Sequence, residues 1–274
     1  MVEERLNRPM LSLERRQRIV TFLARHGSGT IGEMSQLFGV SEMTIRRDLD
    51  VLEAEKVVRR THGGAMFVES SNGEFTFATK MTRDAELKDR IAAVAARQFV
   101  HDDAAIILEG GTTVTSMARY LGEFHNLTVL TNGLQAASQL TTLHPSSTVM
   151  VCGGMLRTIN LTLVGPVTAD FFKRFGADLA FFSAIGFTLE QGFTDANVLE
   201  SQAKVDMRRA AKKAIMLLDS TKYGVRALTS TFTLSDIDVL VTDNDAPLDL
   251  LEHVRAHGVE VLVAGSPQTM RPNS

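Results

Sequence analysis

Residues 39–65 read GVSEMTIRRDLDVLEAEKVVRRTHGGA, and the spacing of hydrophobic residues changes within this run. In its first half Ile45, Leu49 and Leu52 recur at helical intervals, which predicts a helix over residues 41–55 with a capping serine at its start. The second half predicts a hairpin, with strands at residues 57–61 and 65–67 joined by a tight turn.

Two further helices are predicted upstream of this run, at residues 13–26 and 30–38, and Gly27 and Gly39 follow them. Three helices and a hairpin form a winged helix-turn-helix, which we expect to span residues 13–67. We expect residues 1–12 to be flexible. The polar, Gly- and Ser-containing residues 68–80 are expected to form a linker.

The open side of the third helix carries polar and basic side chains, namely Ser41, Thr44, Arg46 and Arg47. In helix-turn-helix proteins the start of this helix enters the major groove, where arginine can bond a guanine edge or a phosphate. The hairpin adds Arg59, Arg60 and His62, which we expect to contact phosphates or the minor groove. An isolated arginine pair would more simply be a solvated helix face, but the neighbouring helices and the basic hairpin favour DNA contact.

The same run, together with ERRQRIVTFLARHG at residues 14–27, resembles the N-terminal domain of DeoR-family bacterial transcriptional regulators. The resemblance covers residues 13–66 almost without a gap. It implies a winged helix-turn-helix that binds operator DNA, usually as a repressor. It also implies that Ser41, Thr44, Arg46 and Arg47 are the base-reading candidates.

After residue 80 the pattern alternates between strands and helices, which is typical of a mostly parallel α/β sheet. We expect this second domain to span residues 81–274. Strands are predicted at residues 104–108, 127–131, 148–152, 179–185, 214–219, 239–242 and 260–263. Helices are predicted at residues 86–100, 114–121, 134–140, 167–175, 196–213 and 248–257.

Three predicted loops after strands are rich in glycine and polar residues. They are Glu109-Gly110-Gly111-Thr112-Thr113, Thr131-Asn132-Gly133, and Gly153-Gly154 with Arg157 close behind. Glycine lets backbone N–H groups approach an anion, and hydroxyl groups and a helix start add donors, a combination that suits a phosphate. Ligands of open α/β sheets bind at the carboxyl edge of the strands, where all three loops are predicted. A glycine-rich turn by itself could equally be a tight turn and nothing more.

Two later segments could complete the site. Asp195, Asn197 and Glu200 could bond sugar hydroxyls, although Asp195 or Asn197 could instead cap the following helix. Lys222 could balance a phosphate charge or be a solvated loop lysine.

The DeoR resemblance continues more loosely over residues 80–245, in ILEGGTT, TNG, CGG, GFTDANVLE and LLDSTKYG. It implies a domain similar to sugar-phosphate isomerases that senses a phosphorylated sugar or a related metabolite such as a sugar acid. Many members have Asp in place of Glu109, and Gly-Ala-Asp-Gly where this chain has Ser183-Ala184-Ile185-Gly186. These departures put the identity of the effector in doubt more than the existence of a pocket.

Composition agrees with a regulator of this kind. The chain has 29 Lys+Arg and 32 Asp+Glu, but residues 1–66 hold 11 and 9 of them, so a slightly basic head precedes an acidic body. The one cysteine and the scattered histidines predict neither a disulfide nor a metal site, and no cofactor is implied. No signal peptide or membrane span is recognisable. We expect a cytoplasmic homo-oligomer, a dimer or tetramer, that binds operator DNA and no membrane.

An enzyme is the alternative, namely a sugar-phosphate isomerase with an appended DNA-binding head. Enolisation needs a positioned base, usually a carboxylate. Ile185 removes one such acid, although Glu109, Asp195, Glu200 or Asp219 could substitute.

Overall fold

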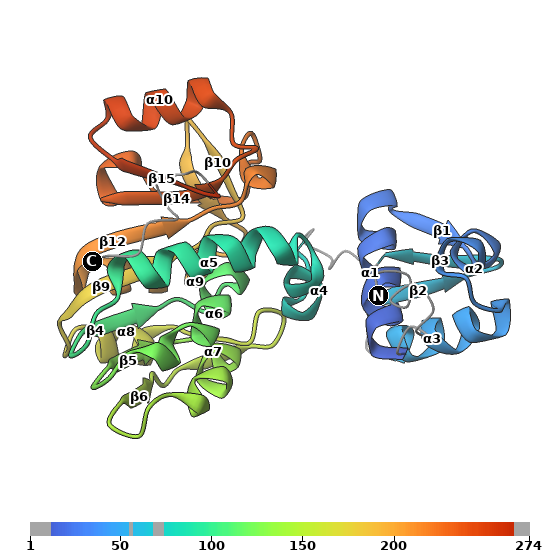
Figure 1. Cartoon of the computed structure of the whole chain (residues 1–274), viewed down its shortest axis with the longest axis horizontal. Coiled ribbons are helices and arrows are strands. Elements are labelled where there is room, and N and C mark those ends of the chain that lie inside the picture. Colours follow the sequence, from blue (N-terminus) through green and yellow to red (C-terminus); the bar gives the residue numbers. More distant parts are fainter. Residues whose placement is uncertain (1–11, 55–56, 68–73, 266–274) are drawn as a thin grey trace, which may run out of the picture. The chain divides into compact units, whose positions relative to one another are not determined.

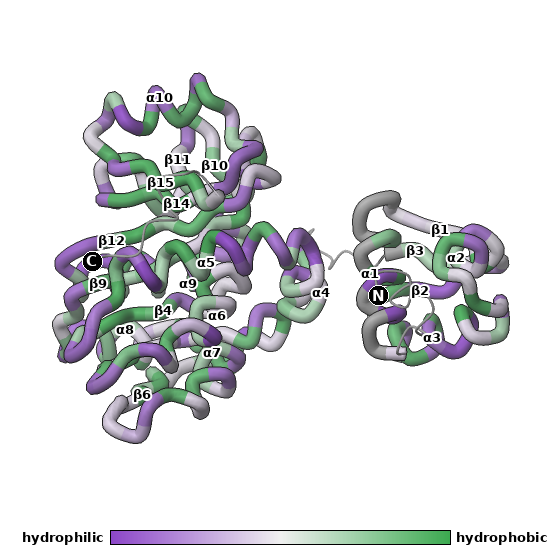
Figure 2. Tube along the Cα trace, in the orientation of Figure 1, coloured by the Kyte–Doolittle hydropathy of each residue, from purple (hydrophilic) through white to green (hydrophobic). Residues whose placement is uncertain are grey.

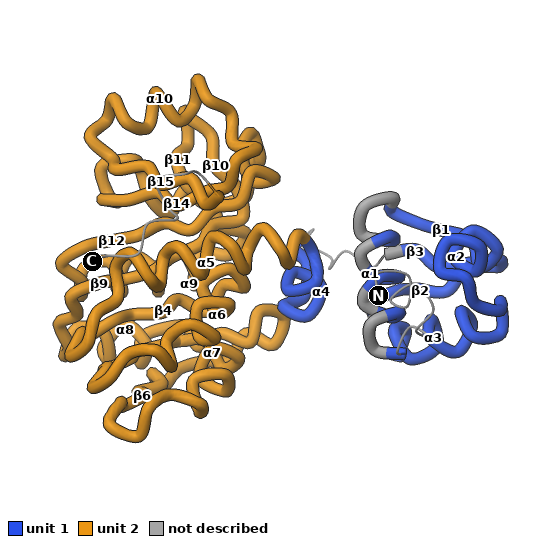
Figure 3. Tube along the Cα trace, viewed as in Figure 1, with its two compact units in different colours: residues 1–83 blue, residues 84–274 orange. Residues whose placement is uncertain are grey.

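The computed structural model describes residues 12–54, 57–67 and 74–265 and contains two compact units, residues 1–83 and 84–274 (Figures 1 and 3). The N-terminus expected to be flexible therefore lies outside the described residues, except for Ser12, at which the first helix begins.

The first unit contains the predicted winged helix-turn-helix. Its elements are α1 Ser12–His26, α2 Ile31–Phe38, α3 Glu42–Ala54, and the wing strands β2 Val58–Thr61 and β3 Gly64–Phe67. A further strand, β1 Ser28–Thr30, was not predicted, and it pairs antiparallel with β3 to give the order β1-β3-β2. Gly64 permits this pairing, because a Cβ there would lie 2.0 Å from the carbonyl oxygen of Gly29.

Local side-chain hydrogen bonds fix the starts of helices α2 and α3. Thr30 and Glu33 form a capping box at α2, and α2 ends at Gly39 in the left-handed conformation (φ 64°). Ser41 caps α3, since its Oγ accepts the backbone N–H of Thr44 at 3.2 Å. The capping role predicted for Ser41 is thus confirmed.

The predicted linker is partly helical. Residues 68–73 lie outside the described residues, but Phe77–Thr82 forms helix α4, which is capped by Thr76 and packs against α1. Phe77 and Thr79 are buried, so the polar composition of residues 68–80 concealed a short amphipathic turn. The boundary between the compact units follows Arg83, three residues later than expected.

The second unit is built on one seven-stranded parallel sheet, as predicted. Its order is β15-β14-β12-β9-β4-β5-β6. The strands are β4 Ala105–Leu108, β5 Thr128–Thr131, β6 Thr148–Val151, β9 Ala177–Phe182, β12 Ala211–Leu217, β14 Val239–Asp243 and β15 Glu260–Ala264. All seven predicted strands are confirmed within a few residues.

Helices cover both faces of this sheet and bury alternate strand residues. Ile106 belongs to the cluster formed with α5 Ala85–Phe99, and Ile107 to the cluster on the opposite face. That second cluster includes residues of α8 Pro166–Phe172, α9 Val198–Arg209 and α10 Leu248–Ala256. Figure 2 shows hydrophobic residues along the interior strand β14.

Two predicted helices need correction. The helix predicted over residues 196–213 ends at Arg209, and its last predicted residues belong to β12, because Ala211 and Ala214 are strand residues of the core. The helix predicted over residues 114–121 is instead α6 Thr112–Ser116 followed by the 3₁₀ turns Met117–Arg119 and Leu121–Glu123. Helix α7 is Leu134–Gln139.

Two small antiparallel sheets were not predicted. One pairs β7 Met155–Arg157 with β8 Thr162–Val164, and the other has the order β10-β11-β13. Its strands are β10 Gly186–Thr188, β11 Gly192–Asp195 and β13 Thr229–Phe232. They decorate the carboxyl edge of the large sheet, since they follow β6, β9 and β12 in the chain.

The side on which successive strands are added to the sheet changes between β4 and β9. From β4 the sheet grows to one side through β5 and β6, and from β9 to the other side through β12, β14 and β15. In doubly wound sheets the crevice outside the strand ends at such a switch point is the usual ligand site.

Candidate functional site: a DNA-reading head and an effector pocket

The apolar stripe of α3 is buried as predicted, and its opposite face is open. Ile45, Leu49 and Leu52 are buried, whereas Ser41, Arg46 and Arg47 are exposed and Thr44 is partly exposed. Arg46 lies 3.5 Å from Glu42 on the same exposed face, a weak surface pair that leaves it accessible to a ligand. The polar and basic side chains of α3 therefore lie on its exposed side.

A buried ion pair fixes α3 against α1. Nε of Arg15 donates to Oδ2 of Asp48 at 2.5 Å, and both side chains are almost fully buried. Asp48 was not singled out in the sequence, because it reads there as one more polar residue of a solvated helix. Its place directly before Leu49, on the buried stripe, was the available signal.

The wing is tied to α3 through Arg60. Nη1 of Arg60 donates to Oδ1 of Asp50 at 2.5 Å and to the carbonyl oxygen of Arg46 at 3.3 Å. Glu53 accepts the backbone N–H of Arg60 at 2.9 Å. Arg59 and His62 are exposed at and beside the turn, so they remain available for phosphate contact. The structure thus gives Arg60 a structural contact that the sequence did not suggest.

In the second unit, two of the three predicted loops meet at the carboxyl edge of β4 and β5. The backbone N–H of Gly110 donates to Oδ1 of Asn132 at 2.9 Å, and a Cβ on Gly110 would lie 2.9 Å from Cα of Gly133. Thr112, Thr113 and Thr131 are buried beside them. The third loop, Gly153-Gly154, instead contacts α8, where Thr168 donates to the carbonyl oxygen of Gly153 at 2.7 Å.

Glu200 holds the β7–β8 hairpin against α9. Its carboxylate accepts Nδ2 of Asn160 at 2.8 Å and Oγ1 of Thr162 at 2.7 Å, and it lies 3.0 Å from Nη1 of Arg157. Glu200 and Arg157, both predicted effector residues, are therefore paired with each other in this structure. Thr162 also contacts Gly110, so the hairpin closes one side of the predicted pocket.

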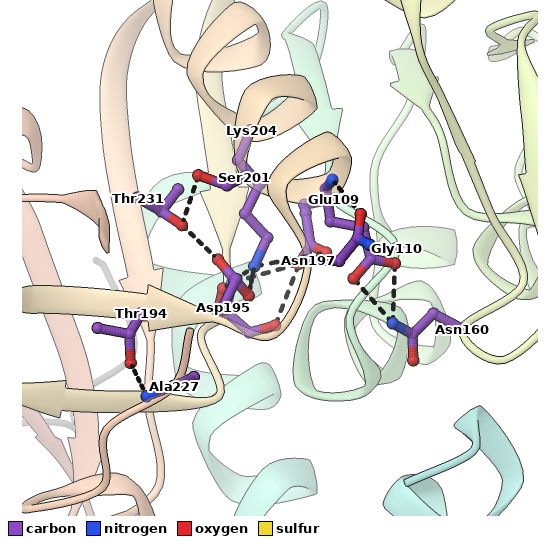
Figure 4. A network of polar contacts seen from close by, with 12 residues as sticks. Glu109, Gly110, Asn160, Thr194, Asp195, Asn197, Ser201, Lys204, Ala227 and Thr231 are labelled. Atoms are coloured by element: carbon purple, nitrogen blue, oxygen red, sulfur yellow. Dashed lines mark hydrogen bonds and ion pairs between the residues drawn. The ribbon is translucent and has the colours of Figure 1, made fainter. Parts of the chain in front are cut away.

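A second buried ionic cluster joins Glu109, Asp195 and Lys204 at the switch point (Figure 4). Nζ of Lys204 donates to Oδ1 of Asp195 at 2.6 Å and to the carbonyl oxygen of Ser183 at 2.7 Å. Oε2 of Glu109 accepts the backbone N–H and the hydroxyl of Ser183 at 3.3 and 3.1 Å. Glu109 follows β4 and Ser183 follows β9, so this contact joins the ends of the two strands at the switch point.

Lys204 is the residue that sequence reasoning missed. It lies one helical turn after Glu200 on α9, and a side chain four residues from a predicted site residue faces the same side of the helix. That spacing was the available signal.

Burial and charge shift the pKa values in this cluster. Desolvation raises the pKa of Glu109, and Lys204 opposes that rise. Desolvation alone would lower the pKa of Lys204, but the carboxylates of Asp195 and Glu109 raise it above its ordinary value. Lys204 is therefore a permanent cation in this buried cluster.

The remaining predicted residues have simpler surroundings. Asn197 caps α9, since its Oδ1 accepts the N–H groups of Leu199 and Glu200. Asp195 does not cap that helix; it ends β11 and also accepts Oγ1 of Thr231 at 2.8 Å. Lys222 lies half-buried in the turn Ser220–Lys222 after β12, and no ion pair within the described part of the chain involves it.

Other chemistries find no support in the described residues. No group of three or more potential metal ligands occurs among them, and none of their helices is long and apolar enough to cross a membrane. Burial raises the pKa of the Cys152 thiol to about 11, which leaves it protonated and unreactive at neutral pH.

Both units match known families along most of their length. Residues 15–71 match the DeoR-like helix-turn-helix domain, and residues 83–244 match the DeoR C terminal sensor domain. The chain belongs to the DeoR family of transcriptional regulators. One DeoR-family relative is the HTH-type transcriptional regulator GolR of Listeria innocua, 36% identical over 93% of this chain and 100% of the relative. Another, the putative aga operon transcriptional repressor of Escherichia coli O157:H7, is 30% identical over 92% of this chain and 94% of the relative.

These DeoR-family relatives are named as transcriptional regulators and not as enzymes, which favours the regulator over the isomerase alternative. Among solved structures, ribose 5-phosphate isomerase from Plasmodium falciparum matches 52% of this chain and 55% of its own, with 13% identity and a TM-score of 0.37.

Proposed function

We propose that this DeoR-family regulator represses a carbohydrate-utilisation operon and releases its operator when a phosphorylated sugar or sugar acid binds in the second unit. The observation that carries the proposal is the buried meeting of the Gly110–Thr113 loop with Asn132 and Gly133 at the switch point. Backbone N–H groups and threonine hydroxyls there suit a phosphate, and Lys222 follows β12 at the same edge of the sheet. Relatives that are named as repressors support repression over activation.

On the DNA side, the same proposal assigns base reading to the exposed start of α3. Ser41, Thr44, Arg46 and Arg47 would contact base edges, while Arg59, Arg60 and His62 of the wing would contact phosphates. Effector binding shifts operator affinity only if the effector prefers one of the two states of the regulator.

A gel-shift titration with the regulator's own promoter fragment tests the proposal. We expect retarded DNA to be released by one member of a panel of sugar phosphates and sugar-acid phosphates, and not by the unphosphorylated sugars. Lys222→Ala and Thr112→Leu should bind the fragment normally and fail to release it. Release by unphosphorylated sugars alone, or unchanged release in both variants, would overturn the phosphate assignment.

We also propose that the protein acts as a homo-oligomer, because helix-turn-helix regulators read paired half-sites. Exposed Leu199 lines a cavity of about 460 Å³ between α8 and α9. Val167 of α8 is also exposed, and this surface suits a second copy. Light scattering of the wild type and of Val167→Glu tests this proposal. A monomeric wild type would contradict it.

A further inference from the structure

The switch point contains one donor and one acceptor that no described residue satisfies. Two of the three hydrogens of Lys204 Nζ are donated to Asp195 and to the Ser183 carbonyl, which leaves the third. Oε2 of Glu109 accepts both groups of Ser183, and the backbone of Gly111 also bonds to the carboxylate, which leaves one of its roughly four acceptor positions. Both residues are at least nine-tenths buried, so these are free bonding positions inside the protein.

The two free positions face each other across a gap. Oε1 of Glu109 lies 3.9 Å from Nζ of Lys204, which is too far for a direct hydrogen bond. An oxygen atom placed between them can lie about 2.8 Å from both atoms, a normal hydrogen-bond length. The gap therefore fits one small polar group that accepts from the ammonium and donates to the carboxylate.

We infer that a hydroxyl group of the effector occupies this gap, so that Lys204 and Glu109 recognise the polyol part of the effector. A hydroxyl both donates and accepts, whereas phosphate and carboxylate oxygens only accept and would face Oε1 unfavourably. This inference rests on the proposed function, because it assumes that the effector binds at the switch point. It adds Lys204 to the site and separates the polyol end of the ligand from its phosphate.

The charge around Lys204 and Glu109 supports a separate place for the phosphate of the effector. Three buried carboxylates, those of Glu109, Asp195 and Glu200, lie in this region against the two cations Lys204 and Arg157. A dianionic phosphate among them would add repulsion in a poorly solvated place, and an uncharged hydroxyl would not. The phosphate is better met by the N–H groups of the Gly110–Thr113 loop.

Rigid supports hold the pair at this spacing. Asp195 fixes Lys204 and is itself fixed by Thr231, whose hydroxyl also lies 3.0 Å from Oγ of Ser201 (Figure 4). A Cβ on Gly111 would lie 2.6 Å from Oε2 of Glu109, so the loop encloses that carboxylate closely. Such pre-organisation means that an incoming hydroxyl pays little to order the site.

The test measures binding of matched ligand pairs to the full-length protein by titration calorimetry. Phosphorylated polyols of three to six carbons are each paired with the alkyl phosphate of the same chain length, and with the polyol lacking phosphate. We expect at least one polyol phosphate to bind at least about tenfold more tightly than its alkyl phosphate, as one charge-assisted hydrogen bond provides.

The variants are Glu109→Gln, Lys204→Met and the double variant. Each single change should remove most of the preference for the polyol phosphate. The double variant should lose no more of this preference than the more damaging single variant, because both residues bind the same hydroxyl. Alkyl phosphate binding should change much less than polyol phosphate binding, a split that a merely structural defect would not give. The matched control is the exposed pair Lys213→Met and Glu260→Gln, 3.5 Å apart in the wild type. If Lys204→Met fails to fold, the near-isosteric Glu109→Gln alone still decides.

Each remaining outcome has a distinct meaning. If alkyl and polyol phosphates bind equally, or if Glu109→Gln binds the polyol phosphate like the wild type, the hydroxyl site is wrong and the phosphate proposal stands. If polyols bind as tightly without phosphate, the phosphate proposal fails and the hydroxyl site stands. If no probe binds the wild type, both are overturned.

Discussion

Arg46 and Arg47 are the side chains of α3 whose removal tests the DNA interface most directly. Both are exposed, so replacement by alanine should leave the unfolding temperature almost unchanged. We expect either variant to lose specific operator binding, by roughly 1–3 kcal/mol if the lost contact is bidentate to a base. Fluorescence anisotropy with operator and random DNA measures this, with Arg255→Ala on the exposed side of α10 as a control. Unchanged affinity in both arginine variants would remove α3 from the interface.

Glu109 should give the second unit a measurable pH dependence. Its pKa is raised in the folded state, so the native protein binds more protons than the unfolded chain above pH 4.5, and stability falls as the pH rises toward the folded pKa. Glutamine cannot ionise. We expect Glu109→Gln to gain stability relative to the wild type from pH 4.5 toward neutral, by at most about 1.4 kcal/mol per pH unit. Urea titrations at several pH values measure this, and Glu260→Gln should show no such trend.

Individual site residues could be predicted from the sequence where a local motif marks them. Glu109 and the glycines after it directly follow a strand, and Ser41 directly precedes a helix, so their places were evident. Lys204 and Ser183 could not be found in this way. The four-residue spacing from Glu200 places Lys204 on the same side of α9, but both residues meet Glu109 only because β9 and α9 fold next to β4.

The contact between α1 and α3 should limit the stability of the winged head. Removing one partner of a buried ion pair leaves an uncompensated charge, so Asp48→Ala should cost roughly 3–5 kcal/mol of unfolding free energy. Glu42→Ala is the comparison, because its pair with Arg46 is exposed and should cost less than about 1 kcal/mol. Chemical denaturation followed by circular dichroism measures both. Equal costs would show that the Arg15–Asp48 pair is not a stabilising tie.

The wing should supply affinity more than sequence specificity. We expect Arg60→Ala to weaken binding to operator and to random DNA by similar factors. The slope of log affinity against log salt concentration should fall by about the amount that one phosphate contact contributes. Its bonds to Asp50 and to the Arg46 carbonyl allow a different result. A variant that loses only operator binding would mean that Arg60 acts by positioning α3. Arg59→Ala, which changes a wing arginine without a contact to α3, separates the two effects.

At the level of elements, the sequence predicted the hydrophobic strands that lie between helices and missed most of the short antiparallel strands. The seven parallel strands were evident because each is a hydrophobic run between helices. Strands β1, β7, β8, β10, β11 and β13 are only three or four residues long and are defined by their partners. Helix α4 was hidden for a related reason, since its buried side rests on α1 rather than on its own sequence neighbours.

The molecule has separate hydrophobic cores for its two units. One cluster contains residues of the winged head, including Ile19, Leu49 and Phe75, and two others lie on the faces of the large sheet. We expect two transitions in scanning calorimetry, the larger belonging to the second unit because unfolding enthalpy grows with residue number. Asp48→Ala should lower only the smaller transition. A single transition shifted as a whole would show that the units unfold together.

The order of strands in the large sheet has a consequence for a chain that folds while it is being made. Among the strands of this sheet, β4, β5 and β6 are synthesised first. However, β4 is an interior strand whose second neighbour, β9, is synthesised only after residue 176. During that interval one hydrogen-bonding edge of β4 stands bare among buried aliphatic residues, which is the kind of edge that recruits other chains. A message or a translation event cut short before Phe182 therefore leaves a nascent product whose aggregation-prone edge is at its very centre.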